Sequence, residues 1–300
     1  MRALGRTGCW FGCWALLLAG CGGTVQHPAE RQDAAVVVVP DPGPGEETGE
    51  PLEVAAPRSL PADADWVTPI RDPRPAAARP RAPQLLVAEL LALRRLLAHT
   101  TTNDPDELKI RRRLAETYVE LRYAAELDER RAMAAVRGND LEARDVAATA
   151  SEQAVEQYRN IVHRYPDDDQ HDSTLYYLAF EYEHQGALDD ARRTYLELIQ
   201  RAPGSERVPA AYLAFGELFL EAAREDPAQW ALARAAYEEV AKYPPPANRG
   251  ACLAQYRLVE VNDALGNRDQ AQQAREKALS CSQEHDLPGS REIRAMLRHR

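Results

Sequence analysis

A helix hairpin is encoded by Asp172–Ser205, which reads DSTLYYLAFEYEHQGALDDARRTYLELIQRAPGS. Its first half carries apolar residues at the spacing of one helix face, and its second half repeats that pattern. Gly186 stands between the halves and suits a left-handed turn residue, while Pro203 stops the second helix. These residues predict two antiparallel helices joined by a short turn.

The second half of this stretch occurs three times in the chain. A small residue, an aromatic residue at +4 and a proline at +12 recur as Ala154-Tyr158-Pro166, Ala191-Tyr195-Pro203 and Ala233-Tyr237-Pro245. Successive copies are 37 and 42 residues apart. Repeats of this length build solenoids, because one hairpin cannot bury its apolar face alone. We predict an all-α solenoid without a sheet.

These residues resemble the tetratricopeptide repeat, whose pattern runs large residue, Leu, small residue, Tyr, turn Gly, Ala, aromatic and Pro. The resemblance implies a tetratricopeptide-like solenoid with Gly186 and Gly266 in hairpin turns. Residues 167–300 are expected to hold the repeats and a C-terminal cap. Residues 83–166 are expected to form a leading helix and a long hairpin, as a degenerate repeat.

The chain begins with a predicted signal peptide over residues 1–20. Its apolar run, Trp10–Ala19, is too short for a membrane span of about 20 residues. Leu18-Ala-Gly-Cys21 resembles the bacterial lipobox, which implies cleavage before Cys21 and lipidation of its thiol. An ordinary secretory signal that happens to end in Cys is the alternative. Gly22 stands where the enteric sorting rule has Asp for the inner membrane, so the outer membrane is expected.

Residues 21–82 are predicted to be the lipidated cysteine and a disordered tether. Twelve of the 21 prolines fall between Pro28 and Pro83, and large apolar residues are few. Such a composition buries too little surface to offset the entropy of the chain. Trp66, in the sequence Asp65-Trp-Val-Thr-Pro69, is interpreted as part of this tether, with a docking peptide as the alternative.

Charge and motifs exclude several classes of function. The chain has 37 basic and 47 acidic residues, a net charge of −10, which argues against a nucleic-acid partner. It lacks the metalloprotease, phosphate-loop and nucleophile-elbow motifs. His163, Asp167–Asp169 and His171 resemble a metal site, but Pro166 interrupts them and the acids lack calcium-loop spacing. We expect no catalysis, metal, cofactor or small-molecule substrate.

The resemblance to the repeat family also implies a concave groove that binds partner proteins. Its wall is aromatic, aliphatic and acidic, and suits a partner with apolar anchors and Lys or Arg flanks. It lacks the basic residues with which chaperone-binding relatives hold a C-terminal carboxylate. The alternative is that these side chains pack between hairpins. The mapped positions are Tyr176, Phe180, Glu183, Leu213, Glu217, Leu220, Tyr256, Glu260 and Asp263.

A narrower resemblance concerns Tyr158–Pro166 and Ala191–Pro203. They look like the BamD-type lipoproteins of outer-membrane assembly and like Tol–Pal-associated repeat proteins. We therefore expect a non-catalytic scaffold, anchored to the periplasmic face of the outer membrane, that recruits envelope proteins. The alternatives are a BamD-like assembly component, an accessory subunit of a cell-wall enzyme, and an enzyme.

Cys252 and Cys281 are the remaining candidates for a disulfide beyond the signal and lipid site. They fall near the open ends of the last hairpin, and an exported chain enters an oxidising compartment. Closing a loop of about 30 residues would stabilise the chain by roughly 3–4 kcal/mol. Two buried, unpaired thiols are the alternative.

Overall fold

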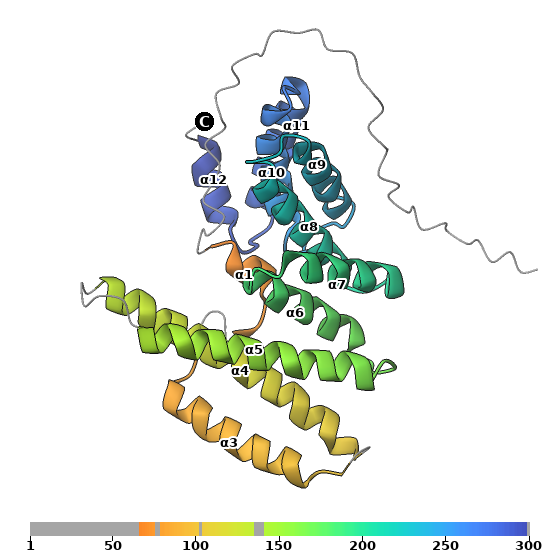
Figure 1. The fold of residues 1–300 in the computed structure, drawn as a ribbon. Coiled ribbons are helices and arrows are strands. Elements are labelled where there is room, and N and C mark those ends of the chain that lie inside the picture. Colours follow the sequence, from red (N-terminus) through yellow and green to blue (C-terminus); the bar gives the residue numbers. More distant parts are fainter. Residues whose placement is uncertain (1–65, 76–78, 102–103, 135–140, 299–300) are drawn as a thin grey trace, which may run out of the picture. The chain divides into compact units, whose positions relative to one another are not determined.

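The computed structural model describes residues 66–75, 79–101, 104–134 and 141–298. All of them lie in the compact unit Glu53–Arg300. They form helices and no strand, which confirms the predicted all-α class (Figure 1). The helices in this part of the chain are α1 (Thr68–Arg71), α3 (Pro83–His99), α4 (Pro105–Ala134), α5 (Leu141–Arg164), α6 (His171–His184), α7 (Leu188–Arg201), α8 (Val208–Ala222), α9 (Gln229–Val240), α10 (Ala251–Ala264), α11 (Arg268–Glu284) and α12 (Ser290–Arg298).

The helices pack as successive hairpins. α4 pairs with α5, α6 with α7, α8 with α9 and α10 with α11, and each hairpin contacts the next (Figure 1). α3 lies against α4 at one end, and α12 lies against α10 and α11 at the other. This neighbour-to-neighbour packing is the tetratricopeptide-like solenoid that the repeats predict.

Glycine turns close the hairpins as expected. Gly186 has a φ of 74° between α6 and α7, and Gly266 has a φ of 73° between α10 and α11. The N–H of Ala187 donates to the carbonyl of Tyr182 at 2.9 Å, and the N–H of Gly186 donates to Glu183 at 2.9 Å. This is the Schellman arrangement, which satisfies the last carbonyls of α6.

Small and aromatic residues set the distances between helices. Ala179 and Ala191 are fully buried, which allows α6 and α7 to approach closely. Tyr195 of α7 is also fully buried, and its ring lies 5.7 Å from the ring of Tyr176 and 6.2 Å from that of Phe215. Tyr195 therefore fills the space between one hairpin and the next, the role that its place in the repeat predicts.

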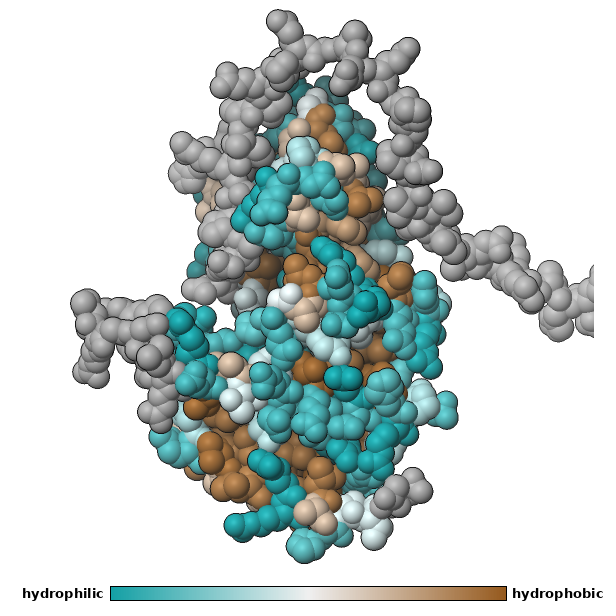
Figure 2. Space-filling model, in the orientation of Figure 1, coloured by the Kyte–Doolittle hydropathy of each residue, from teal (hydrophilic) through white to brown (hydrophobic). Residues whose placement is uncertain are grey.

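The end of the solenoid at α3 exposes apolar side chains. Leu86 and Leu90 are buried against α4, but Leu85, Leu91 and Leu96 are between 52% and 62% exposed. Figure 2 shows apolar surface over this helix. A terminal helix of a solenoid usually presents a polar outer face, so α3 departs from that pattern.

One part of the tether prediction is corrected by the structure. Residues Trp66–Arg74, placed in the disordered tether, include α1 and pack against the solenoid. Their proline content resembles a linker, but contacts with distant helices hold them. Arg81, near the end of the predicted tether, also contacts the solenoid, since it pairs with Glu120 at 2.6 Å. Residues 1–65 lie outside the described residues, and with them the signal peptide, Cys21 and tether residues 22–65. None of the described helices is long and apolar enough to cross a membrane.

Candidate protein-binding groove

The first helices of three hairpins, α6, α8 and α10, carry the residues predicted to line the groove. Residues Trp66–Arg74, here called the docked segment, lie against this face. Figure 1 shows α1 of the docked segment beside α6, α8 and α12. The groove is therefore occupied by a piece of its own chain.

The predicted groove residues of α6 all contact the docked segment. The guanidinium of Arg71 donates to both carboxylate oxygens of Glu183, at 2.7 and 2.5 Å. The hydroxyl of Tyr176 donates to the carbonyl oxygen of Arg71 at 2.6 Å. Arg71 also lies over the ring of Phe180, 5.6 Å from its centroid. A bidentate pair of this kind fixes both the charge and the orientation of the arginine.

A second arginine of the docked segment enters a buried ionic network. Arg74 donates to Glu181 of α6 at 2.8 Å and to the hydroxyl of Tyr158 of α5 at 3.1 Å. Glu181 is fully buried and also pairs with Arg122 of α4, at 3.3 Å. The docked segment thus bridges the first two hairpins.

Asp72 of the docked segment completes this network. It accepts hydrogen bonds from Arg74 at 2.8 and 2.7 Å and from the hydroxyl of Tyr123 at 2.5 Å. Burial opposes its ionised form, but the charge of Arg74 and these hydrogen bonds outweigh burial and lower the pKa of Asp72. Burial first, and then the Asp72 carboxylate, raise the pKa of the Tyr123 hydroxyl. Both groups therefore keep their charge states near neutral pH.

The other end of the docked segment is apolar. Val67 and Ile70 are each 4% exposed and belong to one core with Leu213 and Leu220 of α8 and Tyr256 of α10. These three are predicted groove residues. Trp66 packs against the same core, where a Cβ added to Gly289 would lie 2.7 Å from its ring. The carbonyl of Pro69 also accepts a hydrogen bond from Arg249 at 3.0 Å.

The remaining predicted groove acids take other positions. Glu217 of α8 accepts hydrogen bonds from Arg257 of α10 at 2.9 and 2.7 Å and from the hydroxyl of Tyr237 at 2.7 Å. Burial raises the pKa of Glu217, but Arg257 outweighs burial and holds it below its usual value. Glu260 also pairs with Arg257, at 3.1 Å. These carboxylates neutralise an internal arginine, whereas Asp263 is exposed near the end of α10.

Sequence reasoning missed the occupant of the groove. The predicted tether includes Ile70, Arg71 and Arg74, and the predicted groove does not include Glu181 or Tyr158. The available signal was chemical: the wall suited apolar anchors flanked by basic residues, and Trp66–Arg74 carries both. Linker-like prolines at 69, 73 and 75 concealed this match.

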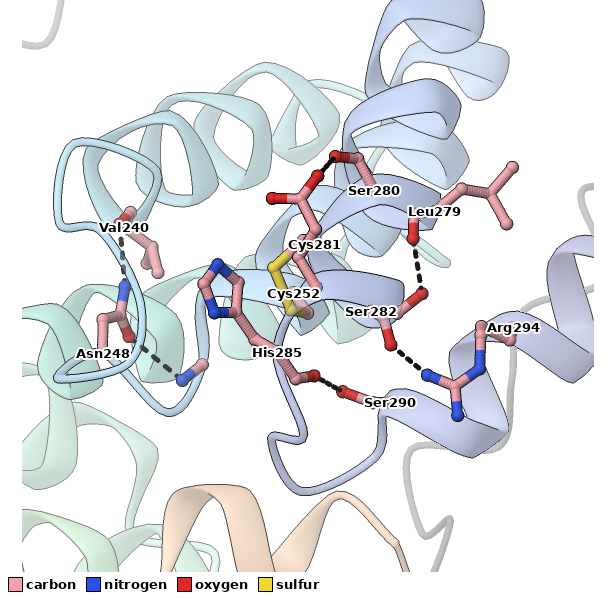
Figure 3. Close-up of a disulfide and its surroundings, with 12 residues drawn as sticks. Val240, Asn248, Cys252, Leu279, Ser280, Cys281, Ser282, His285, Ser290 and Arg294 are labelled. Atoms are coloured by element: carbon pink, nitrogen blue, oxygen red, sulfur yellow. Dashed lines mark hydrogen bonds between the residues drawn. A yellow bond between two sulfur atoms is a disulfide. The ribbon is translucent and has the colours of Figure 1, made fainter.

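A disulfide closes the last hairpin. Cys252 of α10 and Cys281 of α11 are bonded, with their Cα atoms 5.4 Å apart (Figure 3). Nearby, the side chain of Asn248 donates to the carbonyl of Val240 at 3.0 Å, and Ser290 donates to the carbonyl of His285 at 3.0 Å. Because α10 supplies Tyr256 to the groove, the disulfide stabilises one wall of the site.

No group of three or more potential ligands among the described residues is arranged to hold a metal ion. Asp168, one of the acids between His163 and His171, pairs instead with Arg112 at 2.5 Å. This acid therefore serves the contact between α4 and the loop that precedes α6.

Comparison with known proteins gives a match over one hairpin in the middle of the chain. A search of curated proteins and a search of solved structures found no match. Residues 173–205, which cover α6, α7 and the turn between them, match the tetratricopeptide repeat family. The hairpin that forms the polar end of the groove is thus similar to a tetratricopeptide repeat, a kind of module that typically binds other proteins.

Proposed function

We propose that this protein is a lipid-anchored scaffold of the bacterial envelope, which recruits partner proteins through the groove of α6, α8 and α10. The observation that carries the proposal is the occupied groove. It holds a nine-residue stretch of chain through one bidentate arginine contact and a second arginine at one end, and through apolar side chains at the other. A few desolvated anchors of this kind dominate the energy of peptide binding.

Two features support an envelope location. Leu18-Ala-Gly-Cys21 resembles a lipobox, and the Cys252–Cys281 disulfide suits an oxidising compartment. The outer membrane is favoured by Gly22. Lipidation at Cys21 predicts membrane fractionation and an acyl mass on the N-terminal peptide. Cys21→Ala would leave the protein soluble or uncleaved, and unchanged fractionation without an acyl mass would contradict the anchor.

The proteins that bind the scaffold would identify the envelope complex to which it belongs. A role in outer-membrane assembly or beside the Tol–Pal system rests on the resemblance of Tyr158–Pro166 and Ala191–Pro203. Affinity purification from solubilised membranes, with a tag at the C-terminus, tests it. A stable set of envelope proteins supports the scaffold, and assembly proteins among them would favour the BamD-like role.

Other outcomes of the same purification separate the alternatives. Recovery with a cell-wall enzyme would indicate an accessory subunit. Recovery alone, with turnover of a cell-wall substrate, would contradict a non-catalytic role.

A further inference from the structure

The docked segment is not part of any helix hairpin. α1 has four residues and ends at Arg71, while α3 begins at Pro83. The hairpin helices contact one another directly, without α1 between the two members of a pair. Departure of the docked segment would therefore leave the pairing of the described hairpin helices intact.

Without the docked segment, the groove would expose apolar side chains to water. Val67 and Ile70 belong to the same buried core as Leu213, Leu220 and Tyr256, so their departure would expose part of this core. Exposing a contiguous apolar surface is unfavourable, and surfaces of this kind mark sites of protein association. The favourable states are those in which either the docked segment or a partner segment lies in the groove.

Two kinds of contact hold the docked segment. Tyr176 and Arg249 bind the carbonyl groups of Arg71 and Pro69, contacts that any residue at these positions can offer. The side-chain contacts are selective. The paired oxygens of Glu183 match the fork of a guanidinium, which lysine cannot reproduce.

The selective contacts define a pattern. Val67 and Ile70 are apolar and three residues apart, Arg71 follows directly, and Arg74 comes three residues later. The two apolar residues lie in a core with α8 and α10. The two arginines pair with Glu183 and Glu181 of α6. Charge complementarity between the two arginines and the two glutamates fixes the direction in which the segment lies.

We infer that the docked segment is an internal ligand of the groove, and that partners bind by displacing it with a segment of the same pattern. Such a partner presents two apolar residues three positions apart, an arginine directly after the second, and another arginine three positions later. This inference rests on the proposed function, because it names the class of protein segment that the scaffold recruits and the step that controls its entry.

Displacement has a measurable consequence for affinity. For a ligand that binds only the open groove, the apparent Kd equals the intrinsic Kd divided by the fraction of molecules whose groove is open. If the docked segment fills the groove in about 90–99% of molecules, opening it strengthens binding by roughly 10- to 100-fold. Partner binding is therefore weakened by the chain's own segment.

The test measures binding of a labelled peptide of residues 66–75, WVTPIRDPRP, to the full chain by fluorescence anisotropy. The double variant Ile70→Asp/Arg71→Glu places charge in the apolar wall and a carboxylate opposite Glu183, so its own segment leaves the groove. We expect it to bind the peptide at least about 10-fold more tightly than the wild type. Arg79→Glu is the matched control, since Arg79 is exposed and its side chain makes no hydrogen bond or ion pair with the described residues. This control should bind like the wild type.

Peptide variants test the pattern itself. A peptide with Arg71→Glu and Arg74→Glu should lose binding to the double variant by at least about 10-fold. An Arg71→Lys peptide should bind more weakly than the parent peptide, because lysine keeps the charge but not the fork. Equal binding of all three peptides would overturn the assigned pattern.

Amide hydrogen exchange of the wild-type chain provides a second measurement that needs no variant. Residues 66–74 should be protected, and excess peptide should release their protection while α10 and α11 stay unchanged. If the peptide binds neither protein and exchange does not change, the docked segment is a fixed strut and the inference is overturned. If the wild type elutes as a dimer that dissociates in the double variant, the occupant comes from a second copy, which also overturns it.

The purification of partners separates this inference from the proposed function. Partners that increase in the double variant and disappear in Glu183→Arg support both. Partners recovered equally with the wild type, the double variant and Glu183→Arg bind elsewhere, so the scaffold stands and the inference fails. Peptide binding without any recovered partner leaves the internal ligand supported and contradicts the scaffold.

Discussion

The docked segment meets the groove in two ways, polar at Arg71–Arg74 and apolar at Trp66–Ile70. At the polar end, arginines and an aspartate enter a network of buried charges on α4 and α6. At the apolar end, Val67 and Ile70 join a core with α8, α10 and α12. Apolar burial supplies free energy without direction, whereas buried ion pairs contribute little net energy but penalise a wrong partner. We therefore assign affinity to the apolar end and selectivity to the polar end.

Glu181→Ala tests the polar end and should have the largest effect. It removes the carboxylate that pairs with both Arg74 and Arg122. The Arg122 side chain is 1% exposed, so its buried charge would lose one of its acidic partners. Breaking a buried pair from one side costs about 3–5 kcal/mol of unfolding free energy, measured by urea titration. Glu197→Ala is the control: its exposed pair with Arg201 should cost less than about 0.5 kcal/mol. A loss below about 1 kcal/mol in Glu181→Ala would contradict the buried network.

Removing the disulfide tests the wall of the apolar end. Cys252→Ala/Cys281→Ser opens a loop with a sequence separation of 29, which should lower the unfolding free energy by roughly 3 kcal/mol. Hydrogen exchange should rise in α10 and α11, and at Val67 more than at Arg74. Reduced wild type should match the variant. Thiol labelling of both cysteines in the unreduced, denatured wild type would show that no disulfide forms.

Arg71→Lys separates charge from geometry at the polar end. Lysine keeps the positive charge facing Glu183 but loses the second parallel hydrogen bond, so docking should weaken by about 1–2 kcal/mol. Hydrogen exchange of residues 66–74 measures this as faster local opening. Exchange equal to that of the wild type would mean that charge alone holds the segment.

Ile70→Val is the corresponding change at the apolar end. Removing one buried methylene should weaken docking by about 0.5–1.5 kcal/mol. The exchange measurement is the same, and the affinity of the 66–75 peptide should fall by a similar factor when the peptide carries this substitution. Its selectivity against the Arg71→Glu/Arg74→Glu peptide should not change. A loss of selectivity would contradict the division of roles between the two ends.

Acid should weaken only the polar end, with no effect near neutrality. Arg74 and Tyr123 hold the pKa of Asp72 below its unfolded value, so its ionised form adds stability above that unfolded pKa, about 3.9. This contribution falls as the pH drops through the unfolded and then the folded pKa. The difference in unfolding free energy between wild type and Asp72→Asn should be constant from pH 5 to 8 and shrink below about pH 4. A constant difference down to pH 3 would contradict the role of the Asp72 charge.

The solenoid was predictable because its determinants are local. Gly186 and Gly266 act through their own φ angles, and Ala191, Tyr195 and Pro203 act at fixed offsets within one hairpin. Tyr176, Phe180 and Glu183 were found by their place in the repeat, and they contact the docked segment. Glu217 and Glu260 occupy the position of Phe180 in the later hairpins but pair with Arg257, which position alone does not reveal.

The sequence by itself thus determined the helix hairpins, their turns and the chemical character of the groove wall, because each depends on residues close together along the chain. Only the tertiary structure decided what fills the groove. Residues 66–74 have no helical period and three nearby prolines, and their own propensity favours no folded state. They are held by Glu183, Glu181 and Leu213, more than 100 residues away, and contacts at that separation exist only once the hairpins have stacked.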